Sequence, residues 1–356
     1  MTRRFDLLSF RKLVLIPLLS LLATGAFFVG SPRVTQAADS AEAFYKGRTV
    51  FLQMGSEPGG GYDVVGRLVA RTMSKYMPGH PTIVPQNVPG GGSLVLANQF
   101  AKTTKRDGSV FGLMSNGMPT TPLLDPNAAR FDPRQFAFLG STSRETEILV
   151  VWHTAKVKTL ADIFTTPLLV GASSPGSATH DFPYLTNALL GTKFKIVLGY
   201  KGATEVKLAM QRGEVEANAA LAWGSAKTQY ADVLKNKDLL VIGQYGSVKD
   251  VDLPDVPLIP RAKSDADQQI LDIIYARMQY GRPFLTPPGV PQDRVDALRT
   301  AFEATLKDPA FLAEAKKAKV DVEPVSAKEL QDLTDRLFRT PPDVVARLRA
   351  LLKPKK

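Results

Sequence analysis

Short β-branched runs alternate with amphipathic stretches along most of this chain, and no other feature of the sequence constrains its fold as strongly. In the stretch 63–77, for example, apolar residues recur at helical spacing on one face, while Arg67, Arg71 and Lys75 follow one another on the opposite face. Strands that alternate with helices predict mostly parallel sheets with covered faces, which is an α/β fold. The candidate strands are residues 49–54, 82–87, 110–115, 136–141, 148–152, 168–173, 194–200, 219–223 and 239–245.

The C-terminal part of the chain has a different pattern, because it shows helical periodicity without intervening strands. Ser326 and Glu329 have the spacing of a capping box, and Pro309 suits the first position of a helix. The segment 246–265 is rich in proline and aspartate, which indicates an irregular connection. The expected helices are residues 287–306, 307–318, 326–338 and 341–352.

The first 38 residues have the pattern of a secretory signal peptide. A basic start is followed by the apolar run LVLIPLLSLLATGAFFVG and by the small residues Thr35 and Ala37. We expect cleavage after Ala37 or Ala38 and ordinary export of the mature chain. An uncleaved membrane anchor is the alternative, because the run approaches the length that spans a bilayer. Cleavage after Ala37 lowers the formal net charge from +11 to +7.

Composition excludes several classes of protein. The chain has no cysteine, which in an exported protein rules out disulfides and thiolate metal sites. Its 45 basic and 34 acidic residues include no basic run interleaved with aromatic residues, so we expect no nucleic-acid partner. A chain of this length, held together by hydrophobic cores alone, usually forms two domains.

Three glycine-rich loops share one design: each follows a candidate strand and precedes a helix. They are EPGGGYD at 57–63, NVPGGGS at 87–93 and SSPGSATHDF at 173–182. Glycine allows close approach of the backbone, and the start of a helix has unpaired N–H groups that attract anions. The loops therefore indicate an anion site, although each one is also compatible with a simple tight turn. Asp63 has two interpretations, as a helix cap and as a residue that faces a ligand.

Signatures of catalysis are absent from the sequence. It has no P-loop, and the first loop does not fit GxGxxG. There is no HExxH pair, and the three histidines are isolated in the sequence, so we expect no metal site, no cofactor and no enzymatic activity. His180 comes directly after the GSAT segment of the third loop, where it either contacts a ligand or satisfies the start of the helix. An exported enzyme that uses Asp63 or His180 as a base is a less favoured alternative.

Taken together, four segments resemble the Bug-type solute-binding receptors of tripartite tricarboxylate transporters. They are PGGGYDVVGRLVAR at 58–71, the segment 79–102 that contains NVPGGGS, KRDGSVFGLMS at 105–115, and the segment 176–217 that begins GSATHDF. Their order and spacing agree with the family over roughly residues 45–225. A fifth segment, LTPPGVPQDRVDALRTAFEATLKDP, matches the return of the family's chain to its first domain.

The resemblance implies a two-domain periplasmic binding protein of type II, a Venus flytrap whose ligand cleft lies between the domains. We expect a signal peptide at 1–38, a first domain at 39–152 plus 280–356, and a second domain at 153–279. The implied function is capture of a small organic acid in the periplasm by a monomer that delivers it to membrane transporter subunits. A sensing module that reports to a membrane signalling partner has the same site and is the alternative.

The resemblance also implies which residues bind the ligand. Pro58, Tyr62 and the segment 218–223 depart from the family pattern, and Tyr62 and Trp223 suggest a flatter or more aromatic acid as the ligand. Hydroxyl groups of Ser93, Ser177 and Thr179 would add donors to the backbone N–H groups. The full predicted set is Ser56, Gly59, Gly60, Gly61, Tyr62, Asp63, Gly90, Gly91, Gly92, Ser93, Ser177, Ala178, Thr179, His180, Tyr200 and Lys201.

Overall fold

The structure is a computed structural model that describes residues 40–173, 176–200 and 202–352. The predicted signal peptide and the predicted site residue Lys201 lie outside these ranges. Within the described ranges, no helix combines the length and the apolar character that crossing a membrane requires.

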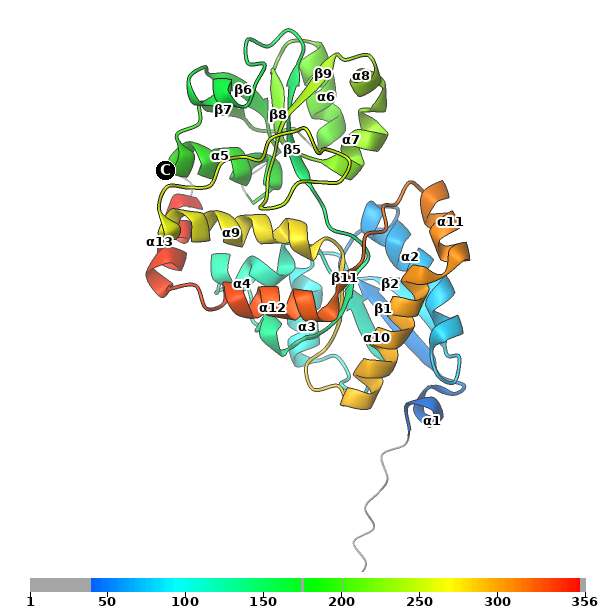
Figure 1. Ribbon diagram of the computed structural model, residues 1–356. Coiled ribbons are helices and arrows are strands. Elements are labelled where there is room, and N and C mark those ends of the chain that lie inside the picture. Colours follow the sequence, from blue (N-terminus) through cyan, green and yellow to red (C-terminus); the bar gives the residue numbers. More distant parts are fainter. Residues whose placement is uncertain (1–39, 174–175, 201, 353–356) are drawn as a thin grey trace, which may run out of the picture. The chain divides into compact units, whose positions relative to one another are not determined.

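The first of two sheets has the strand order β11-β4-β10-β3-β1-β2. Figure 1 labels its strands β1, β2 and β11. Strand β1 pairs in parallel with β2 and β3, whereas β10 is antiparallel to both β3 and β4. Strand β10, which comes late in the sequence, therefore lies between β3 and β4, which come early. The bounds are β1 Thr49–Met54, β2 Thr82–Asn87, β3 Val110–Leu113, β4 Ala137–Ser141, β10 Pro283–Thr286 and β11 Val325–Ser326.

The second sheet repeats this arrangement in the order β7-β6-β8-β5-β9. Here β6 is parallel to β7 and β8, and β5 is the inserted antiparallel strand between β8 and β9. In both sheets, three parallel strands are followed by one antiparallel strand and then by a further parallel strand. The bounds are β5 Glu147–Trp152, β6 Leu168–Gly171, β7 Phe194–Val197, β8 Ala217–Ala222 and β9 Leu239–Gln244.

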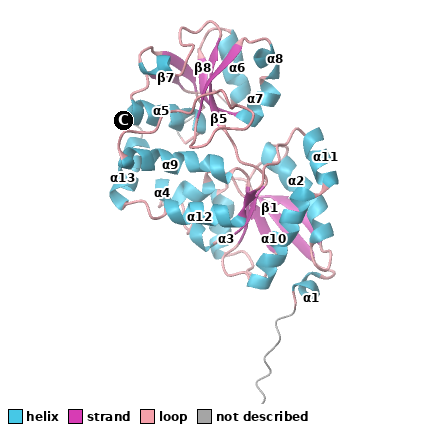
Figure 2. Ribbon diagram, in the orientation of Figure 1, coloured by secondary structure: helices cyan, strands magenta, loops and turns pink. Residues whose placement is uncertain are grey.

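Helices cover both sheets (Figure 2). Helix α2 buries Val65, Leu68, Val69 and Met73 against the first sheet, which agrees with the periodicity of its sequence. The main helices are α2 Gly61–Met73, α3 Leu94–Lys102, α5 Ala178–Leu190, α6 Ala203–Gln211, α7 Trp223–Gln229, α9 Asp265–Tyr280, α10 Gln292–Lys307, α11 Pro309–Lys317, α12 Ala327–Leu337 and α13 Pro342–Leu352. Shorter ones are α1 Ala41–Tyr45, α4 Thr121–Leu124, α8 Ala231–Lys235, and the 3-10 turns η1 Ser74–Tyr76, η2 Met118–Thr120, η3 Pro133–Gln135 and η4 Ala161–Phe164.

We call the first sheet with α2, α3, α10, α11 and α12 the first lobe, and the second sheet with α5 to α8 the second lobe. The chain crosses between the lobes at residues 142–146 and returns through α9 and residues 281–282. The two crossings touch, because the Glu145 N–H donates to the Met278 carbonyl at 2.9 Å. Strand β5, which lies before the predicted domain boundary at residue 152, pairs within the second sheet.

Candidate functional site

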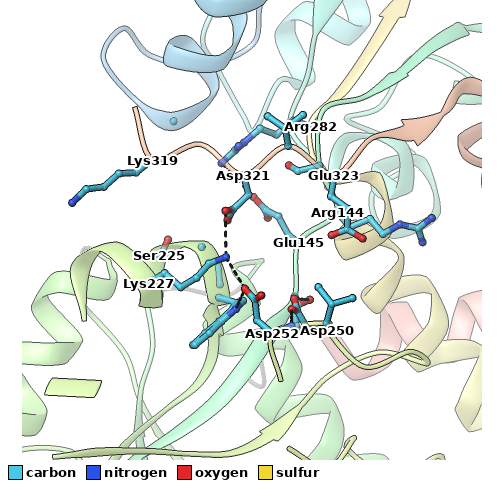
Figure 3. A pocket seen from close by; sticks show the side chains of 18 of the residues that line it. Arg144, Glu145, Ser225, Lys227, Asp250, Asp252, Arg282, Lys319, Asp321 and Glu323 are labelled. Carbon is cyan, nitrogen blue, oxygen red and sulfur yellow. Dashed lines mark hydrogen bonds and ion pairs between the residues drawn. The ribbon is translucent and has the colours of Figure 1, made fainter. Parts of the chain in front are cut away.

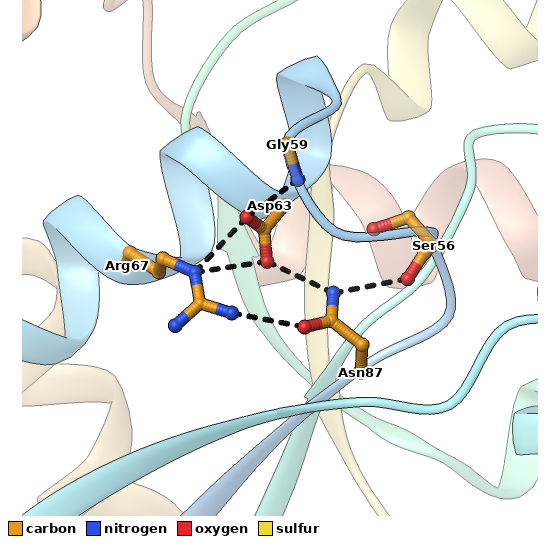
Figure 4. A network of polar contacts seen from close by, with 5 residues as sticks. All are labelled: Ser56, Gly59, Asp63, Arg67 and Asn87. Atoms are coloured by element: carbon orange, nitrogen blue, oxygen red, sulfur yellow. Dashed lines mark hydrogen bonds and ion pairs between the residues drawn. The ribbon is translucent and has the colours of Figure 1, made fainter.

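The first glycine loop, between β1 and α2, is held in shape by Asp63 (Figure 4). The Asp63 carboxylate accepts hydrogen bonds from the Gly59 N–H at 2.9 Å, the Arg67 Nε at 2.9 and 3.0 Å, and the Asn87 amide at 2.9 Å. Asn87 also donates to the Ser56 carbonyl at 3.0 Å. The bond from Arg67 is the main reason why the pKa of Asp63 falls to about 2. Both oxygens of Asp63 are therefore used within the loop, as expected for a structural cap.

Ser93 joins the second glycine loop to the ends of β1 and β3. Its buried hydroxyl donates to the Gly55 carbonyl at 3.0 Å and accepts from the Ser115 N–H at 2.8 Å. The residue has a left-handed backbone (φ 73°), as do the three glycines before it, Gly90, Gly91 and Gly92. The sequence predicted a hydroxyl that donates to a ligand, but the single proton of Ser93 is already used.

Tyr62 connects the start of α2 to the crossing that leads into β10. Its hydroxyl donates to the Gly281 carbonyl and accepts from the Asn116 N–H, both at 3.1 Å. Burial raises the pKa of this phenol well above its usual value. The phenol therefore acts within the structure as a neutral bridge.

At the third loop, the predicted residues of α5 lie close together and bond to one another. Thr179 accepts from the Ser173 N–H at 3.1 Å, and its hydroxyl lies 3.0 Å from that of Ser177. His180 lies 2.9 Å from the carboxylate of Asp181, and its ring stacks on Tyr184. The start of α5, which begins at Ala178, is thus a preformed polar surface.

Two further residues border the third loop. Asp181 also accepts from the Gly176 N–H at 3.0 Å, and Arg277 of α9 approaches its other oxygen at 3.9 Å. Tyr200, from the loop after β7, is half-buried against the core of the second lobe, where a Cβ on Gly171 would lie 3.3 Å from its ring.

A cavity of about 520 Å³ is lined by both lobes and by both crossings (Figure 3). Among the described residues that line it, Gly61 belongs to the predicted site, whereas the second glycine loop and the start of α5 do not take part. The other lining residues are Ser143, Arg144, Glu145, Thr146, Ala222, Trp223, Gly224, Ser225, Lys227, Gln229, Asp250, Val251, Asp252, Arg282, Lys319, Asp321, Val322 and Glu323.

Arg282 is the cation at this cavity that sequence reasoning missed. Its backbone N–H donates to the Ser141 hydroxyl at 2.8 Å, and its side chain is 20% exposed. A terminal nitrogen of the guanidinium lies 3.8 Å from where a Cβ on Gly61 would be, which places it beside the start of α2. The nearest acid in the described structure, Glu145, is 4.0 Å away. Arg282 belongs to no sequence motif, because it is a single arginine before a short strand, so the sequence alone could not identify it as a site residue.

Lys227, in contrast, is neutralised by two acids. Its ammonium donates to Asp252 at 3.0 Å and to Asp321 at 3.2 Å. Asp252 also accepts a hydrogen bond from the indole N–H of Trp223 at 3.1 Å. The sequence predicted that Trp223 contacts the ligand, and its N–H is used in this bond. Among the described side chains, no cluster of three potential metal ligands occurs.

Two acids lie on the first crossing and at the start of β5. Glu145 accepts from the Asn116 amide at 3.0 Å, and burial raises its pKa. Glu147 is 6% exposed, and burial, reinforced by the charge of Glu145, raises its pKa to about 8. One oxygen of Glu147 has no hydrogen-bond partner among the described groups.

Residues 65–352 match the sequence model of a family described as "Tripartite tricarboxylate transporter family receptor". A UPF0065 protein encoded in the TAR-I ttuE-ttuC' intergenic region of Agrobacterium vitis is 28% identical over 288 residues, which cover 79% of this chain and 77% of that protein.

Solved structures with the same fold include a TctC solute binding protein from Polaromonas, with a TM-score of 0.66, 18% identity, and coverage of 86% of this chain and 99% of that one. A protein from R. palustris with adipate has a TM-score of 0.58, 20% identity, and coverage of 85% and 97%. These likenesses confirm the predicted two-domain binding-protein fold.

Proposed function

Because this chain belongs to the family of tripartite tricarboxylate transporter receptors, we propose that it captures a small organic acid in the cavity between its lobes and delivers it to the membrane subunits of such a transporter. The family consists of receptors, so the chain is a solute-binding protein and not an enzyme. The adipate in the R. palustris relative of the same fold supports a carboxylate as the ligand.

Arg282 is the observation that supports an acid ligand most directly. Its guanidinium lines the cavity, is largely shielded from solvent, and forms only a long ion pair of 4.0 Å, with Glu145. A carboxylate there would accept charge-assisted hydrogen bonds from Arg282 and from N–H groups at the start of α2, a helix without a side-chain cap. Such bonds are stronger in a site that excludes water than at an open surface.

We assign the predicted residues of the first lobe mainly to the shape of the site. Asp63, Ser93 and Tyr62 fix the loops through the bonds described above, so that Gly60 and Gly61 keep their N–H groups in place. The N–H of Gly59 is used by Asp63, so Gly59 would contribute to the shape of the loop. The second glycine loop, Gly90 to Gly92, would border the ligand once the lobes close. The second lobe would contribute Ser177, Ala178, Thr179, His180 and Tyr200, and Ser56 would complete the first loop. Lys201, outside the described residues, is proposed on the resemblance of the sequence alone.

We also propose export to the periplasm after cleavage of residues 1–38, on the basis of the N-terminal pattern. We further propose two domains as expected from the sequence, with α9 as part of the connection between them. We place the first domain boundary within residues 142–146, because β5 pairs in the second sheet.

Thermal unfolding of residues 38–356 against a panel of mono-, di- and tricarboxylates, with amides and sugars as controls, tests the acid-binding proposal. A ligand at a hundred times its Kd stabilises the folded state by about 2.7 kcal/mol. We expect stabilisation by acids alone, and its loss in Arg282→Gln. Arg144→Gln is the matched control, since Arg144 lines the same cavity but is paired with Glu329. Stabilisation by no acid, or an undiminished effect in Arg282→Gln, would contradict the proposal.

A further inference from the structure

A second cavity, of about 620 Å³, lies apart from the one described above and shares no lining residue with it. Its walls are the adjacent helices α9 and α12 (Figure 1) and two parts of the connection from β9 to α9, at residues 246–247 and 258–261. Its volume is within the range of cavities that hold small molecules, roughly 300–1,000 Å³. The function proposed above makes no use of this cavity.

The walls of the second cavity are fixed to one another by hydrogen bonds. Helix α9 is joined to α12 through the hydroxyls of Tyr280 and Thr334, which are 2.8 Å apart. The connection is joined to the end of β9, because the Ile259 N–H donates to the Gln244 carbonyl at 2.8 Å. It is also joined to α9, where a side-chain oxygen accepts from the Ala262 N–H at 2.8 Å. The cavity is therefore preformed, and a ligand does not have to assemble it.

An apolar surface forms one part of the wall. Ile259, Leu333 and Leu337 line the cavity, and each is at most 5% exposed. Leu258 and Pro260 extend the same surface. Water finds few hydrogen-bond partners against such side chains, so its replacement by an apolar group is favourable. These residues favour a ligand with an aliphatic body.

Two arginines give the second cavity a positive charge. Arg261 and Arg336 line it and are exposed, and neither side chain forms a hydrogen bond or an ion pair within the part of the chain that the structure describes. The acid among the lining residues, Asp272, accepts from the Gln268 amide at 2.8 Å. Two positive charges and one negative charge leave a formal charge of +1. One carboxylate would balance it, and a guanidinium can bind a carboxylate through two parallel hydrogen bonds.

Tyr275 of α9 adds a buried polar group to the same wall. Its ring packs against those of Phe182 and Tyr245, with centroids 5.0 and 5.5 Å away. Its hydroxyl is buried and has no hydrogen-bond partner among the described groups. Buried hydroxyls in proteins nearly always have a partner, and an acceptor oxygen on a ligand would supply one.

We propose that the second cavity binds an amphipathic monocarboxylate, namely a molecule with one carboxylate and a short aliphatic chain. The carboxylate bonds to Arg261 and Arg336, and the chain lies against the apolar surface of Ile259, Leu333 and Leu337. This site is separate from that of the proposed function, so either proposal can fail while the other stands.

Calorimetric titration of residues 38–356 with octanoate tests the ligand class. Octylammonium has the same chain with the opposite charge, and acetate has the carboxylate without the chain. We expect octanoate to bind more tightly than either compound, by at least about ten-fold. Failure of octanoate to bind, or equal affinity for either of the other two compounds, overturns the inference.

The double variant Arg261→Gln/Arg336→Gln tests the location of the site. We expect it to lose at least about ten-fold in affinity for octanoate, whereas Arg282→Gln, at the other cavity, keeps the binding that the double variant loses. Arg339→Gln is the matched control, because Arg339 is an exposed arginine shortly after α12 that does not line the second cavity. Undiminished binding in the double variant, or binding that is lost only in Arg282→Gln, overturns the inference. Unfolding curves without ligand establish that each variant folds.

Discussion

Lys227 on α7 and Asp321, in the segment that joins α11 to β11, form an ion pair of 3.2 Å that links the second lobe to the first (Figure 3). Lys227 is held on its other side by Asp252 at 3.0 Å, within the second lobe. The bond to Asp321 therefore joins the two lobes at the wall of the cavity, whereas the bond to Asp252 lies within the second lobe and orients the lysine.

Asp321→Asn is expected to open the unliganded protein, because it weakens this link between the lobes. Both side chains are substantially exposed, so the loss in unfolding free energy should stay below about 1 kcal/mol. Small-angle scattering without ligand should show a larger radius of gyration than in the wild type. Asp252→Asn, which keeps the bond across the cavity, is the control. An unchanged radius in Asp321→Asn would show that the pair does not restrain the lobes.

Asp63→Asn should destabilise the first lobe at neutral pH. The pKa of Asp63 is about 2 when folded and near 4 when unfolded, so its stabilising effect is present above pH 4 and is lost as the pH falls toward 2. The difference corresponds to about 2 kcal/mol at pH 7. Denaturant unfolding of both proteins between pH 7 and pH 2 should show a difference in unfolding free energy that becomes smaller as the pH falls. A difference that does not depend on pH would show that the ionised Asp63 carboxylate is not its source.

Glu147→Gln should have the opposite pH dependence. Burial raises the folded pKa of Glu147 to about 8, so the unfolded chain releases its proton at lower pH than the folded chain. Stability should therefore decline in the wild type as the pH rises from about 4.5 to 8. Glu145 and Arg277 are the charged groups that influence this pKa most. The variant should gain stability relative to the wild type across that range, and a constant difference between the two would contradict the prediction.

Ser93→Ala should cost about 1–3 kcal/mol, because it leaves the Gly55 carbonyl and the Ser115 N–H without their partner. Ser93→Gly removes the same hydroxyl but tolerates the left-handed backbone at this position. Denaturant unfolding should therefore rank Ser93→Gly between the wild type and Ser93→Ala. Equal stability of all three proteins would show that neither the hydroxyl nor the backbone conformation matters there.

The sequence predicted those parts of the fold that depend on local pattern. The runs at 49–54 and 82–87 are strands with the predicted bounds, and the capping box of Ser326 and Glu329 is present. Pro309 begins α11 as expected. These features are set by periodicity and by backbone chemistry within a few residues, which a single sequence displays.

The sequence did not predict β10, β11 or α9. Strand β10 has four residues and exists because β3 and β4 pair with it on both sides, far away in the chain. Helix α9 is buried along most of its length between the lobes, so its amphipathic pattern is weak. The partners of Asp63 and Ser93 likewise come from other segments, Asn87 in one case and Ser115 in the other. Residues that the tertiary structure brings together have no spacing that could be recognised beforehand.

The position of the ligand carboxylate is the central claim, and a crystal structure of residues 38–356 with the most stabilising acid measures it directly. We predict a carboxylate within hydrogen-bond distance of the Arg282 guanidinium and of the backbone at the start of α2. A carboxylate held only by the second glycine loop and the start of α5, with Arg282 still facing Glu145 at its present distance, would contradict the account.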